Sequence, residues 1–183
     1  MRHRLSGTPL SSLALILGLA LSGGALVSEA NAQVRLSGSG IVCPRETTGP
    51  LVEAPDTEAG FIRQVEGTMA FDLNSHQVPL MTDLSFGIRT ELKPGSPPLP
   101  ITVVVTHPPL GPRGVTRESW PDTVLPGEEN VNLFTFEEEY EKVPGRWTFG
   151  IEVDGESVVT VPFDVLPEGG RGPIEQACFN FLS

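Results

Sequence analysis

The clearest pattern along the chain is the alternation of apolar and polar residues with a period of two, which is typical of β-strands. Apolar side chains alternate with Ser, Gly, Arg and Glu over residues 84–92, and residues 101–106 form an unbroken apolar and β-branched run, as in strands covered on both faces. Weaker strand patterns occur at 34–43, 61–73 and 131–136.

The strongest pattern is a hairpin over residues 144–165, whose two arms both alternate around Asp154-Gly155. A two-residue turn would place the apolar residues of the two arms on opposite faces. A three-residue loop at 153–155 pairs Phe149 with Val159 and brings both apolar sets to one face, so burial favours this register.

Eighteen Pro and twenty Gly separate the strand patterns, and no convincing helix is visible. Residues 108–126 are predicted to be a surface loop, because they are rich in Pro and Gly. About seven short strands with frequent turns predict an all-β fold, an antiparallel immunoglobulin-like β-sandwich. A small closed β-barrel is the alternative. Phe179, Phe181 and Leu182 could form a final edge strand beside the first strand.

The N-terminal 32 residues have the composition of a secretory signal peptide: Arg2 and Arg4, an apolar run over 13–27, and Ala30-Asn31-Ala32. Cleavage after this motif would leave a β-sandwich domain over 33–166 and a C-terminal tail over 167–183. The predicted location is periplasmic or secreted, without stable membrane insertion. An uncleaved anchor is disfavoured because Ser and Gly interrupt the apolar run at 22–24.

The formal net charge of −11 argues against nucleic acid and anionic membranes as partners. The two cysteines, Cys43 and Cys178, are predicted to form a structural disulfide in an oxidising compartment, tying the tail back to the start of the domain. A redox-active pair is the alternative, but the chain has no C-x-x-C motif.

No catalytic residue, metal ligand set or cofactor is predicted, and the protein is not expected to be an enzyme. His76 and His107 lie far apart without Cys, and His107 is expected to be exposed or to cap a strand end beside Pro108. Gly38-Ser39-Gly40 lacks the strand-to-helix context of a nucleophile elbow.

Three polar segments have structural explanations. The acidic run over 137–139, together with Glu141, is expected to be a solvated strand edge. Asp154-Gly155-Glu156 has the composition of a turn, without the alternating carboxylates of a calcium loop. The glycine-rich segment 169–172 is expected to be a flexible tail, since it opens no helix that could bind phosphate.

Two residues are candidates for binding a partner. Trp120 and Arg117 lie in the predicted 108–126 loop, and both residue types are enriched at interface hot spots. Trp120 could instead close one end of the sandwich, because exposed tryptophan is uncommon on monomers.

Three segments resemble a family of secreted bacterial proteins that is known only as a domain of unknown function: Phe86-Gly87-Ile88, ITVVVTHPPL (101–110) and YEKVPGRWTF (140–149), the last followed by PFDV (162–165). The resemblance covers about 34–165 and implies a small immunoglobulin-like sandwich with no established activity.

Together these patterns predict a monomeric, non-catalytic interaction module. It would bind an unidentified envelope protein through a sheet edge or the 108–126 loop. A small-ligand carrier or sensor, with an apolar pocket between the sheets, is the alternative.

Overall fold

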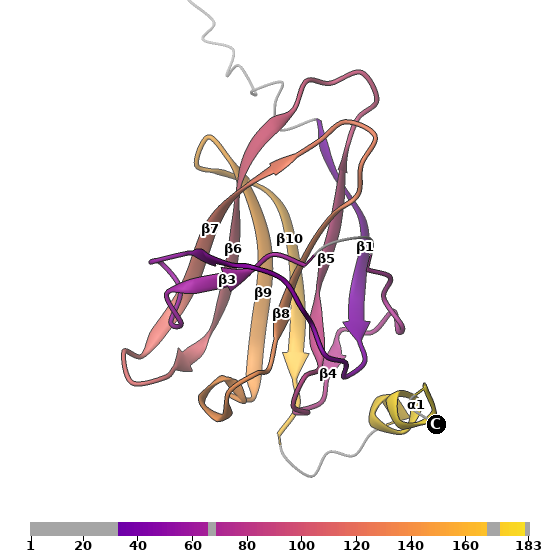
Figure 1. Cartoon of the computed structure of the whole chain (residues 1–183), viewed down its shortest axis with the longest axis vertical. Helices are drawn as coiled ribbons and strands as arrows, with labels where there is room; N and C mark the ends of the chain where they lie inside the picture. The colour runs from indigo at the N-terminus through magenta and orange to yellow at the C-terminus, as the bar shows by residue number, and fades with distance from the viewer. Residues whose placement is uncertain (1–32, 66–68, 168–172, 182–183) are drawn as a thin grey trace, which may run out of the picture.

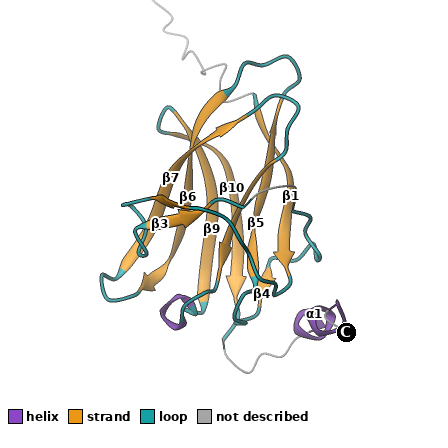
Figure 2. Ribbon diagram, in the orientation of Figure 1, coloured by secondary structure: helices purple, strands orange, loops and turns teal. Residues whose placement is uncertain are grey.

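The computed structural model describes residues 33–65, 69–167 and 173–181, and its strands form two sheets packed face to face (Figure 1; Figure 2). The predicted signal peptide (1–32) and the glycine-rich segment 169–172 lie outside the described residues. One sheet has the order β1 (Val34–Val42), β5 (Ser85–Leu92), β8 (Asn130–Thr135). The other has the order β4 (Gln77–Val78), β10 (Glu156–Val165), β9 (Gly145–Val153), β6 (Leu99–Leu110), β7 (Val115–Val124). A separate two-stranded ribbon consists of β2 (Leu51–Glu53) and β3 (Phe61–Arg63).

The connectivity is that of an immunoglobulin-like sandwich, as predicted. The β9–β10 and β6–β7 hairpins lie side by side in one sheet, which matches the G-F-C-C′ order of variable-type immunoglobulin domains. The alternative of a closed barrel is wrong, because no strand pair among the described strands joins the two main sheets. The strand expected over 61–73 is reduced to β3 and an isolated bridge between Ile41 and Leu73.

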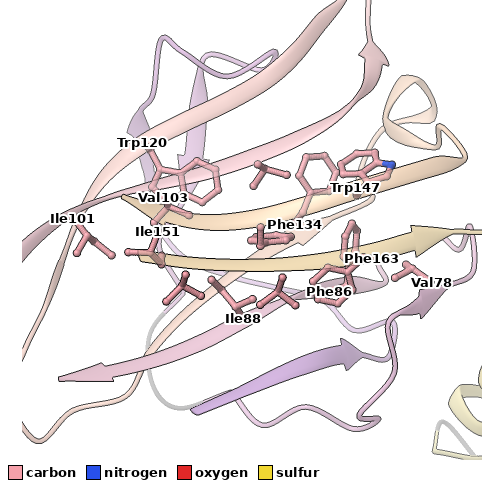
Figure 3. Packing of buried hydrophobic residues seen from close by; sticks show 14 of the residues in the cluster. Val78, Phe86, Ile88, Ile101, Val103, Trp120, Phe134, Trp147, Ile151 and Phe163 are labelled. Carbon is pink, nitrogen blue, oxygen red and sulfur yellow. The ribbon is translucent and has the colours of Figure 1, made fainter. Parts of the chain in front are cut away.

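Aromatic rings fill the space between the two sheets (Figure 3). Phe86 of β5 packs edge-on against Phe149 of β9, with ring centroids 5.7 Å apart, and Phe134 of β8 lies 4.8 Å from the Trp147 ring. Gly87 allows β8 to approach β5, since a Cβ at this position would lie 2.1 Å from the Asn132 carbonyl oxygen. The core is therefore dry and closely packed at its centre.

The 144–165 hairpin has its apolar residues on one face, as predicted, but the predicted register is wrong. Val161 pairs with Phe149, two residues from the expected Val159. The chain makes a two-residue turn with Asp154 and Gly155 at φ 52° and 81°, typical of a type I′ turn. A bulge between Ser157 and Val159 then moves the apolar set of β10 back to the buried face.

The predicted surface loop over 108–126 is also wrong. β6 continues through His107, Pro108 and Pro109 to Leu110, with an irregularity there, and β7 pairs antiparallel with it. β7 is the edge strand of its sheet, which is where Pro121 is tolerated.

The C-terminal segment is a helix, α1 (Pro173–Phe181), and the predicted final strand is wrong. The Cys43–Cys178 disulfide is present and joins the residue after β1 to this helix, while Ile174 packs against the core. No helix in the described part of the chain is long and apolar enough to cross a bilayer.

A candidate binding groove along strand β8

A hollow lies between the β2–β3 ribbon and strands β7 and β8. Its volume is about 510 Å³. We call it the β8 groove. Its lining comprises Thr47, Thr57, Ala59, Phe61–Val65, Met69, Glu118, Trp120–Asp122, Glu129–Thr135, Glu137 and Glu141.

The floor of the β8 groove is the edge of β8 that pairs with no other described strand. This strand is the last of its sheet, and every residue from Glu129 to Thr135 lines the groove. Side chains of neighbouring strand residues point to opposite faces, so an uninterrupted run indicates that the groove follows the strand edge and not one face.

The direction of the backbone groups on this edge follows from the pairing register. The N–H of Phe136 donates to the carbonyl oxygen of Leu84 at 3.1 Å, and β8 pairs with β5 without a register shift. Hydrogen-bonded and non-hydrogen-bonded pairs alternate in antiparallel sheets. The N–H and C=O groups of Val131 and Leu133 therefore point away from β5, toward the groove.

A polar network forms the inner wall. Trp120 Nε1 donates to Asn132 Oδ1 at 3.3 Å, Asn132 Nδ2 donates to Asn130 Oδ1 at 2.6 Å, and Asn130 Nδ2 donates to Asp122 Oδ2 at 2.7 Å. These bonds join β7 to β8 across the gap between the two sheets. The amide groups are satisfied by one another and by Asp122, which leaves this wall polar and negatively charged.

Glu118 of β7 is a buried carboxylate next to this network, with 5% of the residue exposed. Its Oε1 accepts a hydrogen bond of 2.6 Å from the N–H of Glu58, in the loop between β2 and β3. Burial raises the pKa of Glu118, and the neighbouring Glu58 carboxylate adds to this. Arg113 Nε lies 3.4 Å from Glu58 Oε2 and compensates part of the negative charge.

Glu141 lies at one end of the β8 groove, in the 3-10 helix η2 (Glu139–Glu141). Its Oε2 accepts hydrogen bonds of 2.8 Å from the N–H groups of both Glu137 and Glu138. Burial raises its pKa to about 7, with further contributions from Glu137 and Glu118. The prediction of a solvated edge is thus wrong for Glu141, although residues 137–139 are exposed.

The opposite wall of the groove carries exposed apolar side chains. Phe61 and Val65 line the groove, and each is 42% exposed. Leu51 and Val52, on the paired strand β2, are also exposed. The β2–β3 ribbon therefore presents an exposed apolar surface across from the acidic inner wall. Exposed apolar patches of this kind often mark sites that bind another protein.

The two predicted binding residues lie on opposite faces of β7. Trp120 is 8% exposed, packs in the core and reaches the groove. Arg117 is exposed on the outer face, where Nη2 lies 3.2 Å from both carboxylate oxygens of Glu152. The structure does not bring them together on one face of the sheet.

The expectation of an exposed or capping His107 is wrong. The residue is 6% exposed, and its ring lies 4.7 Å from that of Trp147. Its Nδ1 lies 2.8 Å from the Pro108 carbonyl oxygen, which can only accept, so Nδ1 carries the proton. Burial lowers the pKa of His107.

Two further polar candidates are in contact in the folded chain. Ser39 Oγ and His76 Nε2 lie 2.7 Å apart on the surface, a contact that their sequence separation concealed. No carboxylate among the described residues orients the His76 ring in a hydrogen bond. Across residues 33–65, 69–167 and 173–181, no group of three His, Cys, Asp or Glu side chains could hold a metal ion.

Several groove residues were not predicted as functional. Glu118, Asp122 and Asn132 face the interior of a sandwich, where alternation would call for apolar residues. Polar residues at such positions were the available signal. The signal is hidden at Glu118 and Asp122, because residues 108–126 have the Pro- and Gly-rich composition of a loop.

A comparison with known protein families found one match over most of the chain. A family model described as "Domain of unknown function (DUF3859)" matches residues 31–165, which confirms the expected uncharacterised family. No curated protein matches the chain. Among solved structures, the chain is similar to an immunoglobulin-like protein from Pseudomonas aeruginosa, with 20% identity, a TM-score of 0.44, and coverage of 75% of this chain and 99% of that one.

Proposed function

The chain belongs to the DUF3859 family, whose function is unknown, and we propose that it is a non-catalytic module that holds a segment of a partner protein in the β8 groove. The observation that carries this proposal is the unpaired edge of β8, lying between an acidic inner wall and the exposed apolar ribbon. Natural sheets usually protect such edges. An edge left open inside a hollow is suited to pairing with another chain.

The roles of the buried carboxylates support binding without catalysis. Glu118 and Glu141 already hold backbone N–H groups of the loops around the groove. Each uses one carboxylate oxygen to hold the backbone, a structural role that needs no proton transfer to a substrate.

The proposed place of action is the periplasm or the cell exterior. The predicted signal peptide supports this location, and the Cys43–Cys178 disulfide is compatible with an oxidising compartment. The proposed active form is a monomer.

A small ligand is the second candidate occupant, and its site would be the β8 groove. A volume of about 510 Å³ is within the range of small-molecule pockets. The earlier idea of an apolar pocket between the sheets has less support, because aromatic rings occupy that space.

Site-specific photo-crosslinking in living cells tests the proposed function. A photoreactive amino acid replaces Val65 in the groove and, as a matched control, Thr160 on the exposed outer face of β10. We expect one reproducible protein adduct from position 65 and none from position 160, identified by mass spectrometry. The same adduct at both positions, or none at either, would contradict the proposal. In the second case, a ligand-dependent rise in melting temperature would favour the small-ligand alternative.

A further inference from the structure

We propose that the β8 groove selects an extended peptide segment in which basic residues alternate with apolar ones, and that this segment adds to β8 as an extra strand. This inference rests on the proposed function and specifies the partner's chemistry. Three independent features of the groove support it: backbone direction, charge and the distribution of apolar surface.

The backbone of β8 offers hydrogen-bonding groups to a new strand. Val131 and Leu133 direct their N–H and C=O groups into the groove, and β8 is six residues long. An added strand would use these groups as PDZ-type grooves do, with main-chain hydrogen bonds giving affinity and side-chain pockets giving specificity. A matching peptide needs about six residues.

The charge of the inner wall favours a cationic side chain. Glu118, Asp122 and Glu141 accept hydrogen bonds from backbone or amide N–H groups, and none of the three forms an ion pair within 4.0 Å among the described residues. Among the lining residues, Arg63 is the one cation, and its Nε lies 3.5 Å from Glu137. Burial raises the pKa of Glu118 and Glu141, so the negative charge of the groove comes mainly from Asp122, Glu129 and Glu137. These carboxylates outnumber the single cation of the lining, and they would attract lysine or arginine.

The two faces of β8 explain why the basic residues should alternate with apolar ones. Asn130 and Asn132 point inward, toward Asp122, whereas Val131 and Leu133 point to the outer face. The wall on that outer side includes Met69, whose carbonyl oxygen accepts a hydrogen bond of 2.8 Å from Arg89 of β5. Successive side chains of an added strand would meet these two environments in turn.

A designed peptide tests the proposal directly. The probe is a fluorescein-labelled, terminally blocked hexapeptide of alternating lysine and valine, titrated with the mature protein and followed by fluorescence anisotropy. Two control peptides have the same length. One replaces every lysine by glutamate, and the other carries N-methyl groups on alternate residues and cannot pair along that edge. We expect salt-sensitive binding of the lysine peptide, with at least tenfold weaker binding of both controls.

Two double variants test whether the lysine peptide binds in the β8 groove. Asp122→Asn combined with Glu129→Gln removes two charges from the groove, while Glu128→Gln combined with Glu156→Gln removes two exposed charges outside it. We expect the groove variant to bind the lysine peptide roughly fivefold more weakly, and the control to be within twofold of the parent protein.

The outcomes separate this inference from the proposed function. Equal binding of the N-methylated and unmodified lysine peptides would overturn strand addition, and equal binding of the glutamate peptide would overturn the selection of basic residues. If the lysine peptide fails to bind while position 65 still crosslinks to a partner, only the inference fails. Concentration-dependent dimerisation that competes with the peptide would identify a second copy of this chain as the occupant and would also overturn it.

Discussion

The two tryptophans show how differently the two sides of this sandwich are built. Trp147 is fully buried among phenylalanine rings, and its Nε1 donates to the Val143 carbonyl oxygen at 3.0 Å. Trp120 is nearly as buried, but its Nε1 donates to Asn132, within a network of amides that ends at Asp122. The first residue lies in a dry core, whereas the second closes the core against a polar groove.

This difference suggests that the aromatic core determines stability, whereas the groove serves the proposed binding. The dry core holds the two sheets together through apolar burial, which tolerates few polar atoms. Retaining several carboxylates and amides beside it costs stability, which supports the binding role proposed for the groove. Substitutions in the core should therefore change mainly the free energy of unfolding, and substitutions in the groove should also change peptide affinity.

The largest effect is expected from Trp147→Ala. Truncation leaves a cavity among phenylalanine rings whose centroids lie 4.8–6.0 Å from that of the indole, so the free energy of unfolding should fall by about 4 kcal/mol. Urea denaturation followed by circular dichroism measures this change. Binding of the lysine peptide at low temperature, where the variant remains folded, should not change. A loss below about 1 kcal/mol would contradict the assignment of Trp147 to the core.

The disulfide should come next. Replacing both Cys43 and Cys178 by serine opens a link that spans 135 residues, and should lower the free energy of unfolding by roughly 3 kcal/mol. The link lies away from the lining of the β8 groove, so peptide affinity should be unchanged in the folded variant. Denaturation of the parent protein with and without a reducing agent provides the matched comparison. Loss of peptide binding in the folded double variant would show that α1 shapes the groove.

Trp120→Ala should change both properties. Its removal extends a hollow that is already open, so the expected stability loss is about 2 kcal/mol, less than for Trp147. Loss of the hydrogen bond to Asn132 should also disturb the inner wall and weaken lysine-peptide binding about tenfold. The same two assays measure both effects. An unchanged affinity would place Trp120 with the core alone.

The sequence pattern predicted the dry side well and failed at the groove. Alternation identified β5, β9 and β10 and the shared face of the hairpin, because those strands bury one apolar side. In β7 the inward positions hold Glu118, Trp120 and Asp122, so a real strand has the composition of a loop. The bulge after Ser157 could not be predicted either, because it restores burial through backbone geometry that leaves the alternation unchanged. The helix α1 was missed because Phe179 and Phe181 alternate by chance in a short segment.

The pH dependence of stability should depend in part on Glu141. Because the pKa of this carboxyl is raised to about 7 in the folded state, its protonated form contributes stability at acidic pH. That contribution is lost as the pH rises from about 4.5 through 7, by on the order of 1 kcal/mol after allowance for solvent screening. Glu141→Gln keeps an acceptor for Glu137 and Glu138, and should remove this decline.

Urea denaturation of the parent protein and the Glu141→Gln variant between pH 5 and pH 8 measures this contribution as a difference. The two proteins must be compared because His107 changes the pH dependence of stability in the opposite direction. Burial lowers the pKa of His107, so its contribution to stability is lost as the pH falls. Parallel pH profiles for the two proteins would contradict the assignment.

The smallest effect is expected from Arg117→Ala, which tests the outer face of the same strand that carries Trp120. Its ion pair with Glu152 is exposed, so the free energy of unfolding should fall by no more than about 0.5 kcal/mol. Positions 117 and 120 lie on opposite faces of β7, and peptide affinity should therefore stay within twofold of the parent protein. A fivefold or greater loss of affinity would mean that the partner continues around the β7 edge onto the outer face. Recognition would then involve both candidates first suggested by the sequence, through a peptide that wraps the edge of the five-stranded sheet.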